Sequence, residues 1–528
     1  MSKTKSDALF QLIKSLKKSE KRYFKLQSRL EDPNTKYLML FDQMDSQTTY
    51  NEREIIQAVP GIKAQQLSNL KAHLYKKVLQ CIRQYNQSAV MDIQIREMID
   101  HAQILFNRSL YDQCVEMLKK AKKRAKKIDN LELQLVILKW EKNILTQTIG
   151  PDNETRVNRI IEEVKDVSAR INNINKFTNL SAQLNSIYTK IGFIRNQTDL
   201  DTISGLFNSQ LPKFNEDELS PNEKLNLYNL YVGYYFFLQD FEKGHQYAEK
   251  GVQLFDSHKE LRYFRVEGYL NAINSLMIAQ YKRHEYHSFV DTSRRLREIR
   301  HYPKNLINEN IRLKLLKYTY VHEFNRIFML GEFSSGVSLM NKIKPRLEYF
   351  ITQLDNHSKI ILYYKVACLY FGNDNYRESI QWLNRITYFE NIDLREDIHS
   401  FARILNLISH YELGNMDVID YYIRSTYRFM LKKDDLHRFQ KAILNFLRKL
   451  AGEFTEEDLI PEFQKLRKRL LPMQNNPFEK RAFIYFDIIS WLESKIQKER
   501  VQDVIAEKAR KTLERQQHEK KVKLKLPQ

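Results

Sequence analysis

The chain has 528 residues, a formal charge of +21 and 42% hydrophobic residues, which exclude both a single small domain and a largely disordered chain. Its 13 Gly and 11 Pro fall below half of the roughly 12% that the two residue types average together. Because the turns of β architectures need Gly and Pro, this deficit predicts helices joined by short polar loops, in about three or four domain-sized units or one repeat array.

The positive charge is concentrated toward the two ends of the chain. Residues 1–150 carry 27 Lys and Arg against 16 Asp and Glu, and residues 461–528 carry 17 against 9. The segment between them, residues 151–460, is almost neutral, with 42 against 40. Attraction to a phosphate backbone needs clustered cations and no sequence motif, so this distribution predicts polyanion-binding surfaces at the ends.

The first 90 residues predict short helices. Apolar residues recur at helical spacing in the first of them: Leu9, Leu12, Ile13 and Leu16. Ser19 is predicted to cap a second helix, and Asp32-Pro33-Asn34 is a break. Residues 51–87 predict a helix, a turn at Pro60-Gly61 and a long helix.

The pair of helices in residues 51–87 is also compatible with a helix-turn-helix motif, with residues 67–83 as the recognition helix. On that interpretation cations would face phosphates and polar residues would face bases: Lys71, Lys76, Lys77, Arg83, Asn69 and His73. The wide apolar stripe on the same helix favours burial instead.

From about residue 91 a pattern repeats, in which a helix ends in a short polar turn and an aromatic or Met residue begins the next amphipathic helix. These residues are Tyr111, Phe241, Tyr286, Phe333, Tyr376 and Met416. The last five are separated by 45, 47, 43 and 40 residues. Neither helix of such a pair can bury its apolar stripe alone, so stacked helical hairpins are predicted.

The segment 361–386, ILYYKVACLYFGNDNYRESIQWLNRI, resembles the tetratricopeptide-repeat family. The chain departs from that family in its longer period, since the family unit has about 34 residues, and in lacking small residues at several packing positions. The resemblance implies an all-α helical-hairpin repeat array, a tetratricopeptide-like solenoid. The domains expected are a basic helical domain at 1–90, repeats at 91–460, and C-terminal helices with a basic tail at 461–528.

The whole chain is also similar to a group of bacterial tetratricopeptide-like proteins that begin with a segment like LIKSLKKSEKRYFKL, residues 12–26 here. That group includes a ribosome-hibernation structural protein. The resemblance implies a ribosome-associated role in hibernation or translation silencing.

The sequence offers no catalytic motif. Gly331 to Gly336 has the spacing of a phosphate-binding loop, but Val337 stands where Lys is required. His284 and His287 lie one turn apart without a placed partner, which favours a surface pair over a metal site. The expectation is a protein that is not an enzyme and has no cofactor.

The cysteines and the apolar runs bear on the compartment. Cys81, Cys114 and Cys368 are isolated from one another and show neither a disulfide framework nor metal-ligand spacing; the first two are predicted core residues. No apolar run approaches a signal peptide's core or the ~18 residues of a membrane span. The sequence therefore predicts a cytoplasmic protein without a membrane partner.

The strongest local signal is at residues 119–127, where seven of nine residues are cationic: Lys119, Lys120, Lys122, Lys123, Arg124, Lys126 and Lys127. A helix over this segment would leave Leu118, Ala121 and Ala125 to face its neighbours. The helix dipole accounts for one or two cations near a C-terminus, whereas seven repel one another. A partner of opposite charge is predicted, with a solvated helix end as the alternative.

Two further clusters and the C-terminus are also basic. The N-terminal cluster interleaves with Tyr23 and Phe24, which are expected to pack inward, and consists of Lys14, Lys17, Lys18, Lys21, Arg22 and Lys25. A weaker cluster, equally consistent with an ordinary repeat surface, consists of Arg294, Arg295, Arg297 and Arg300. Near the C-terminus Lys520, Lys521, Lys523 and Lys525 alternate with apolar residues in a strand-like pattern, which indicates a solvated tail or an arm that orders on a partner.

The function predicted from the sequence is a scaffold that binds structured RNA, with the ribosome as the foremost candidate, through contacts to shape and backbone. The N-terminal, 119–127 and C-terminal cations would make these contacts. Two alternatives remain open: a protein–protein adaptor that uses a tetratricopeptide groove, and a helix-turn-helix DNA-binding regulator. Association into a homodimer is left open as well.

Overall fold

The computed structural model describes residues 8–31, 36–86, 90–148, 152–389, 393–433, 435–450 and 456–523. Within these ranges the regular structure is entirely helical and contains no strand, which confirms the all-α class. No helix in the described part of the chain combines the length and apolar character needed to cross a membrane.

The chain divides into two compact units, residues Met1–Val167 (unit 1) and Ser168–Gln528 (unit 2). The domain boundaries expected after residues 90 and 460 stay predictions. Long helix α9, Asn153–Ile191, contains the division between the units.

Unit 1 contains eight helices before α9 in its described residues. They are α1 (Ala8–Ser15), α2 (Lys18–Glu31), α3 (Lys36–Ser46), α4 (Glu52–Ala58), α5 (Ala64–Asn86), α6 (Met91–Asn107), α7 (Tyr111–Lys127) and α8 (Leu131–Leu145). Helices α4 and α5 confirm the predicted order of a helix, a turn at Pro60-Gly61 and a long helix. The Asn51 side chain caps α4 by accepting hydrogen bonds from the backbone N–H groups of Arg53 and Glu54. Side chains from α1 to α5 share one apolar core.

The prediction that Ser19 caps α2 is wrong, because Ser19 lies inside the helix. The first turn of α2 forms from Lys17, two residues before Ser19. The Glu20 carboxylate accepts a hydrogen bond from the Lys17 backbone N–H at 2.8 Å, and the Lys17 carbonyl accepts from the Lys21 N–H at 3.0 Å. An acidic side chain at the N-terminus therefore replaces the expected serine cap.

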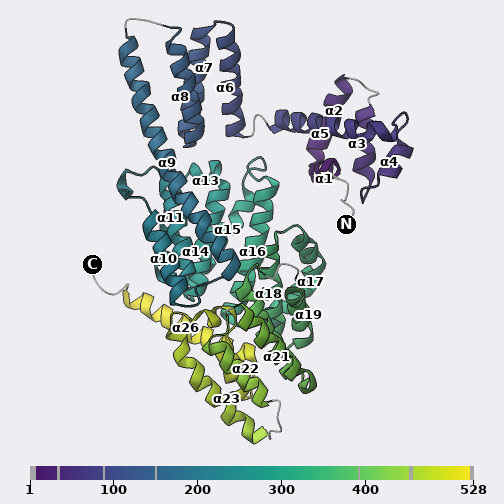
Figure 1. Cartoon of the computed structure of the whole chain (residues 1–528), viewed down its shortest axis with the longest axis vertical. Coiled ribbons are helices and arrows are strands. Elements are labelled where there is room, and N and C mark those ends of the chain that lie inside the picture. Colours follow the sequence, from purple (N-terminus) through teal and green to yellow (C-terminus); the bar gives the residue numbers. More distant parts are fainter. Residues whose placement is uncertain are drawn as a thin grey trace. The chain divides into compact units, whose positions relative to one another are not determined.

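Unit 2 contains the remaining helices (Figure 1). They are α10 (Gln197–Gln210), α11 (Pro221–Phe237), α12 (Phe241–Ser257), α13 (Leu261–Phe264), α14 (Val266–Lys282), α15 (Tyr286–Glu298), α16 (Glu309–Leu330), α17 (Phe333–Thr352), α18 (Asn356–Gly372), α19 (Tyr376–Thr387), α20 (Glu396–Glu412), α21 (Met416–Lys432), α22 (Arg438–Leu450), α23 (Glu456–Leu470), α24 (Arg481–Tyr485), α25 (Ile488–Gln497) and α26 (Val501–Lys523). From α11 to α21 most helices lie beside the helix that follows them in the chain.

Each of the six predicted junctions is a chain reversal after which a helix begins at the predicted residue. Two positions before each new helix the backbone has a positive φ of 55° to 72°, at Ser109, Gln239, His284, Gly331, Asp374 and Gly414. A left-handed residue ends a helix and turns the chain back. Only two of the six are Gly, which explains how a chain with so few glycines forms so many turns.

Four of these turns share an aromatic contact across the reversal. A ring in the last turn of the first helix contacts the ring that begins the second, with centroids 5.2–5.7 Å apart, in the pairs Phe106–Tyr111, Phe236–Phe241, Phe328–Phe333 and Phe371–Tyr376. Such pairs add about 0.5–1.5 kcal/mol to the burial of the rings. The contact explains the recurring aromatic residue, while the stacking of the hairpins as a tetratricopeptide-like solenoid stays a prediction.

The C-terminal helix α26 extends through Lys523, so the strand-like interpretation of Lys520, Lys521 and Lys523 is wrong. The helix is anchored by the buried side chains of Val501 and Val504 and continues through residues of high helix propensity. The short alternation of apolar and cationic residues is too brief to override that propensity. The described side chains end at His518, and Lys525 lies outside the described residues.

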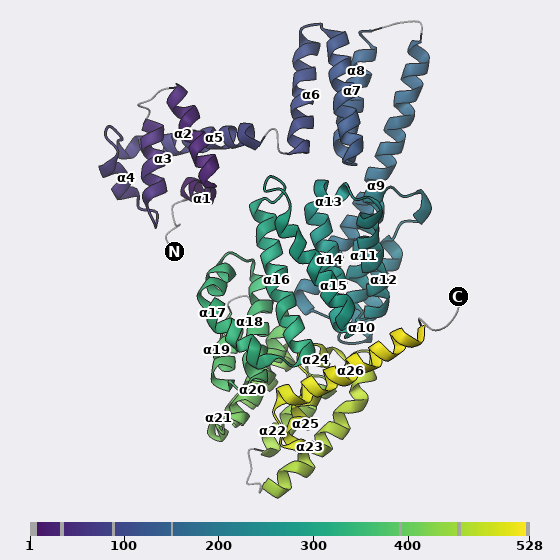
Figure 2. The ribbon, with the colours of Figure 1, turned by 180° about the vertical axis from the view of Figure 1, so that it is seen from behind.

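Helix α26 lies against three of the hairpin turns of unit 2 (Figure 2). Gln516 donates to the His284 carbonyl at 2.7 Å, and Arg500 forms an ion pair with Asp374 at 3.0 Å. At Gly331 the approach is backbone to backbone, because a Cβ placed there would lie 2.6 Å from the nitrogen of Ala506. The docking of α26 therefore requires a glycine in this turn.

We expect Gly331→Ala to loosen α26, since the methyl group clashes with backbone that has no rotamer to change. Gly414→Ala is the matched control, because Gly414 has the same φ of +72° and a Cβ added there would have nothing within 4 Å. Both variants bear the cost of a left-handed Ala, about 1–2 kcal/mol. Only Gly331→Ala should also raise amide hydrogen exchange along α26 and lower the melting temperature further; equal behaviour of the two variants would contradict this account.

Candidate functional site

The N-terminal cations divide into paired and unpaired groups. Lys17, Lys18 and Arg22 are exposed, and no ion pair joins them to any described residue. Lys21 pairs with Asp45 at 2.5 Å and Lys25 with Asp42 at 2.7 Å. The three unpaired residues form what we call the α1–α2 patch.

The other residues of the predicted N-terminal cluster, and the two aromatic residues interleaved with it, make contacts inside unit 1. Lys14 donates a hydrogen bond to the Asp45 carbonyl oxygen at 2.6 Å. Phe24 is buried, as expected, and the partly buried Tyr23 ring lies 5.3 Å from that of Tyr85. Both aromatic side chains therefore pack against the protein, as the sequence predicted.

Helix α7 presents its cations on the side opposite its buried residues. Leu118, Ala121 and Ala125 are fully buried, as predicted. Lys120 and Lys123 are exposed, and no ion pair joins them to any residue in the described ranges. We call these two residues the α7 patch.

Other cations of the 119–127 segment have partners within unit 1. Lys122 lies between Glu141 at 2.7 Å and Glu163 at 2.9 Å, and its side chain is only 13% exposed. Arg124 donates to the Gln94 side chain at 2.7 Å. Both residues join α7 to neighbouring helices. Lys122 is held between two carboxylates and has little capacity left for a ligand, whereas Arg124 donates one hydrogen bond to a neutral amide.

Lys119 and Lys126 form weaker pairs at the rim of the α7 patch. Lys119 pairs with Glu116 at 2.8 Å, with both side chains more than 60% exposed, and Lys126 pairs with Glu163 at 3.4 Å. An exposed pair such as Lys119–Glu116 contributes about 0–1 kcal/mol, so a phosphate can replace Glu116 at little cost. Glu163 is only 27% exposed and also pairs with Lys122, so this argument does not extend to Lys126. Lys127 also has a partner in the structure.

The alternative DNA-reading helix, α5, has some of its predicted contacts occupied. Lys71 pairs with Glu52 at 3.6 Å and donates to the Tyr50 hydroxyl at 2.8 Å. The His73 ring stacks on that of Tyr37. Asn69 and Lys76 are exposed. DNA recognition by this helix stays a prediction.

Two of the four residues of the weaker arginine cluster form ion pairs, and Arg297 and Arg300 are exposed. Arg294 pairs with Asp291 at 2.8 Å, while Arg295 pairs with Asp256 at 2.5 Å and donates to the Tyr269 hydroxyl. This arrangement agrees with an ordinary helix surface.

Unit 2 contains a cavity of about 740 Å³ that the sequence did not reveal, here called the inner cavity. It is lined by α9 and by the first helix of each of four successive hairpins, α11, α14, α16 and α18. The polar lining consists of Lys282, Lys317 and His357, small hydroxyl residues, and the amides of Asn185, Asn226, Asn229 and Asn274, and none of the described residues that line it is Asp or Glu. The only signal in the sequence was the regular spacing of the hairpins, which indicates that their first helices lie next to one another.

Burial perturbs the ionisable groups of the inner cavity. Loss of solvation, with Lys365 and Arg395 nearby, holds the pKa of Lys282 well below its usual value. Burial also lowers the pKa of Lys317, although the Asp355 carboxylate opposes this effect. Burial lowers the pKa of His357 to about 4, and its buried Nδ1 has no hydrogen-bond partner among the described residues.

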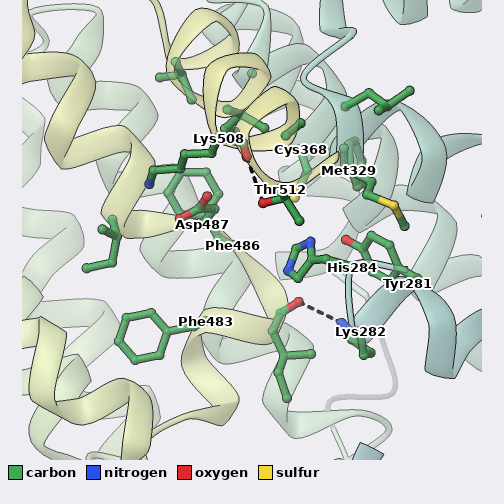
Figure 3. A pocket seen from close by; sticks show the side chains of 18 of the residues that line it. Tyr281, Lys282, His284, Met329, Cys368, Phe483, Phe486, Asp487, Lys508 and Thr512 are labelled. Atoms are coloured by element: carbon green, nitrogen blue, oxygen red, sulfur yellow. Dashed lines mark hydrogen bonds between the residues drawn. The ribbon is translucent and has the colours of Figure 1, made fainter. Parts of the chain in front are cut away.

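A second cavity of about 700 Å³ lies beneath α26 (Figure 3). It shares Lys282 with the inner cavity, and Lys282 donates to the Ile484 carbonyl at 3.1 Å. Its lining mixes the acidic Asp487 and Glu493 with Lys508, and the last two form an ion pair at 2.6 Å. Because both signs of charge line it, this cavity gives no reason to expect a ligand of one particular charge.

A buried ion pair stands next to the inner cavity. Arg395 donates two hydrogen bonds to Asp397, at 2.9 and 2.8 Å, and the Tyr485 hydroxyl donates to the same carboxylate. The Arg395 guanidinium also lies 5.1 Å from the centre of the Tyr188 ring, which lines the cavity. Burial opposes ionisation of Asp397, but Arg395 and Tyr485 outweigh it and hold its pKa below the usual value.

Comparison of the chain with protein-family models, with curated proteins and with solved structures gives no match. In the described ranges no group of three or more His, Cys, Asp or Glu is arranged to hold a metal ion. The three cysteines are buried and form no disulfide, and the predicted core positions of Cys81 and Cys114 are confirmed.

We expect Asp397→Asn to lower the free energy of unfolding by about 3–5 kcal/mol, because it leaves the buried Arg395 without a counter-charge. Asp420→Asn is the control: Asp420 pairs with Arg424 at the surface, where both side chains are about half exposed or more, and should change stability by less than about 1 kcal/mol. Urea denaturation of both variants measures the difference. Similar losses would show that the buried pair has no special role.

The stability difference between wild type and Asp397→Asn should also depend on pH. The folded pKa of Asp397 is depressed, so its contribution is complete above the unfolded pKa of about 4 and is lost as pH falls through the folded value. Unfolding curves at several pH values between about 7 and 2 should show the difference shrinking only at the acidic end. A constant difference would contradict the assignment.

Proposed function

We propose that the protein is a non-enzymatic helical scaffold that binds structured RNA through unit 1. The observation that supports this is the set of cations in the α1–α2 and α7 patches that are exposed and form no ion pair with a described residue: Lys17, Lys18, Arg22, Lys120 and Lys123. Unpaired like charges on one helix face are unfavourable in the free protein and become favourable when phosphates neutralise them.

The proposed RNA contacts involve fewer residues than the basic segments of the sequence contain. Lys119 joins the α7 patch by exchanging the exposed Glu116 carboxylate for a phosphate. Lys122 remains between its two glutamates, one of which, Glu163, also pairs with Lys126. Contacts of this kind follow the backbone and shape of an RNA rather than its sequence.

The ribosome is the first RNA to test, because the segment at residues 12–26 contains the α1–α2 patch and resembles the start of a tetratricopeptide-like group that includes a ribosome-hibernation structural protein. A role in hibernation or translation silencing, and a cytoplasmic location, are part of this proposal. The C-terminal lysines Lys520, Lys521, Lys523 and Lys525 remain candidates for a further contact.

Ribosome binding by the purified protein should weaken steeply with added salt, since each phosphate contact releases counterions. Lys120→Glu combined with Lys123→Glu should reduce the slope of log K against log salt by about two. Lys17→Glu combined with Lys18→Glu should act in the same way. Sedimentation with ribosomes across a series of salt concentrations provides the measurement.

The matched control reverses the same number of charges in unit 2, at Lys259 and Lys304, which are exposed and lack ion pairs among the described residues. This control should bind like wild type. Equal weakening in the control, or binding that ignores salt, would contradict the assignment to unit 1. A protein partner rather than RNA would give co-sedimenting material that survives nuclease treatment.

A further inference from the structure

The inner cavity of unit 2 differs from the rest of the molecule in its charge. Lys282 and Lys317 line it and no carboxylate of the described residues does, although exposed and half-buried ion pairs are common elsewhere in the unit. Lys282 donates to a backbone carbonyl and Lys317 to the Ser358 hydroxyl at 3.2 Å. The Lys282 amine therefore lies next to a cavity that offers it no counter-charge, and an anionic ligand bound there would supply one and favour the protonated amine.

The neighbouring carboxylates are engaged elsewhere. Asp355 accepts hydrogen bonds from the Ser358 backbone N–H and hydroxyl at 2.9 and 2.6 Å, and compensates part of the Lys317 charge. Asp397 is bound by Arg395. The uncompensated charge is thus largest at Lys282.

The amides of the inner cavity match a peptide backbone. Each Asn side chain offers two donors and an acceptor, the same groups that a peptide presents in alternation. Asn185 and Asn229 form no side-chain hydrogen bond in the described structure, and the Asn226 Oδ1 accepts none there. Asn229 lies one turn before Gly233, where nothing lies within 4 Å of a Cβ position, so the wall is open beside it.

The size and walls of the cavity agree with a short peptide. Its volume of about 740 Å³ falls within the usual range of ligand sites, about 300–1,000 Å³. Aromatic side chains line it, among them Tyr188, Phe193 and Phe236. Arginine, whose planar fork suits phosphate, is not among the described lining residues, and two lysines are few for a polyphosphate. A carboxylate is the better fit.

We propose that the inner cavity binds a short segment of another protein whose acidic side chain, Asp or Glu, pairs with Lys282 and Lys317 while the asparagines bind its backbone. This site would be the groove of the adaptor function that the sequence left open. It does not rest on RNA binding, because its residues belong to unit 2 and the RNA contacts to unit 1.

The test uses the full chain and a library of fluorescein-labelled hexapeptides with amidated C-termini, some acidic and some with every Asp and Glu replaced by Asn and Gln. Fluorescence anisotropy should show acidic peptides that bind at least tenfold more tightly than their neutral counterparts. Binding that is equal for the two sets, or found only when the C-terminus is left free, would overturn the proposal. Stronger competition by ATP than by the unlabelled acidic peptide would also overturn it in favour of a phosphate ligand.

Variants locate the site. Lys317→Met and Asn229→Leu should each weaken binding of the selected peptide by about tenfold, through loss of a charge or of a backbone contact. Lys342→Met removes an exposed lysine outside the cavity and should leave binding unchanged. Because Lys282 also bonds to Ile484, Lys282→Met is interpreted only if its melting temperature matches wild type. Unchanged binding in Lys317→Met and Asn229→Leu would place the peptide elsewhere and overturn the assignment.

Discussion

Four of the six predicted hairpins share one aromatic contact at the chain reversal. An aromatic ring in the last turn of one helix meets the ring that begins the next, as in Phe371 and Tyr376, and a left-handed residue between them turns the chain. The backbone strain at non-glycine positions such as Asp374 persists because the two helices that it joins pack together. Where another helix approaches such a turn backbone to backbone, as α26 does at Gly331, glycine is required.

The succession of hairpins also brings polar side chains together in the inner cavity. Because hairpin follows hairpin, the first helices of four of them line one space, and residues far apart in sequence, such as Asn229, Lys282 and Lys317, come to share it. Each is unremarkable on its own helix. Together they line a cavity whose described lining has no acidic side chain. Arg395 of the buried Arg395–Asp397 pair packs on the ring of Tyr188, which is one of the lining residues. The cavity is thus a product of the packing of helices and of no single motif.

Charge acquires two different roles in the two units. In unit 1, α7 turns Ala121 and Ala125 inward, so that Lys120 and Lys123 face outward, while Lys122 is drawn between two glutamates. A run of cations that looks uniform in the sequence therefore separates into residues that hold helices together and residues that can meet a partner. In unit 2 the unusual charges are the partly buried lysines, whose ionisation is opposed by lost solvation.

The sequence by itself determined the all-helical class, the turn at Pro60-Gly61, the six helix starts and the inward face of α7, because these follow from local periodicity and from residues adjacent in the chain. It failed at Ser19, where a side chain three residues from the turn replaced the expected cap, and at Lys520 to Lys523, where helix propensity outweighed a short alternation. Only the tertiary structure decided which cations are neutralised and which helices face the inner cavity. Lys122 meets Glu141 and Glu163 across 19 and 41 residues, and such pairings depend on how helices pack, which local sequence does not encode.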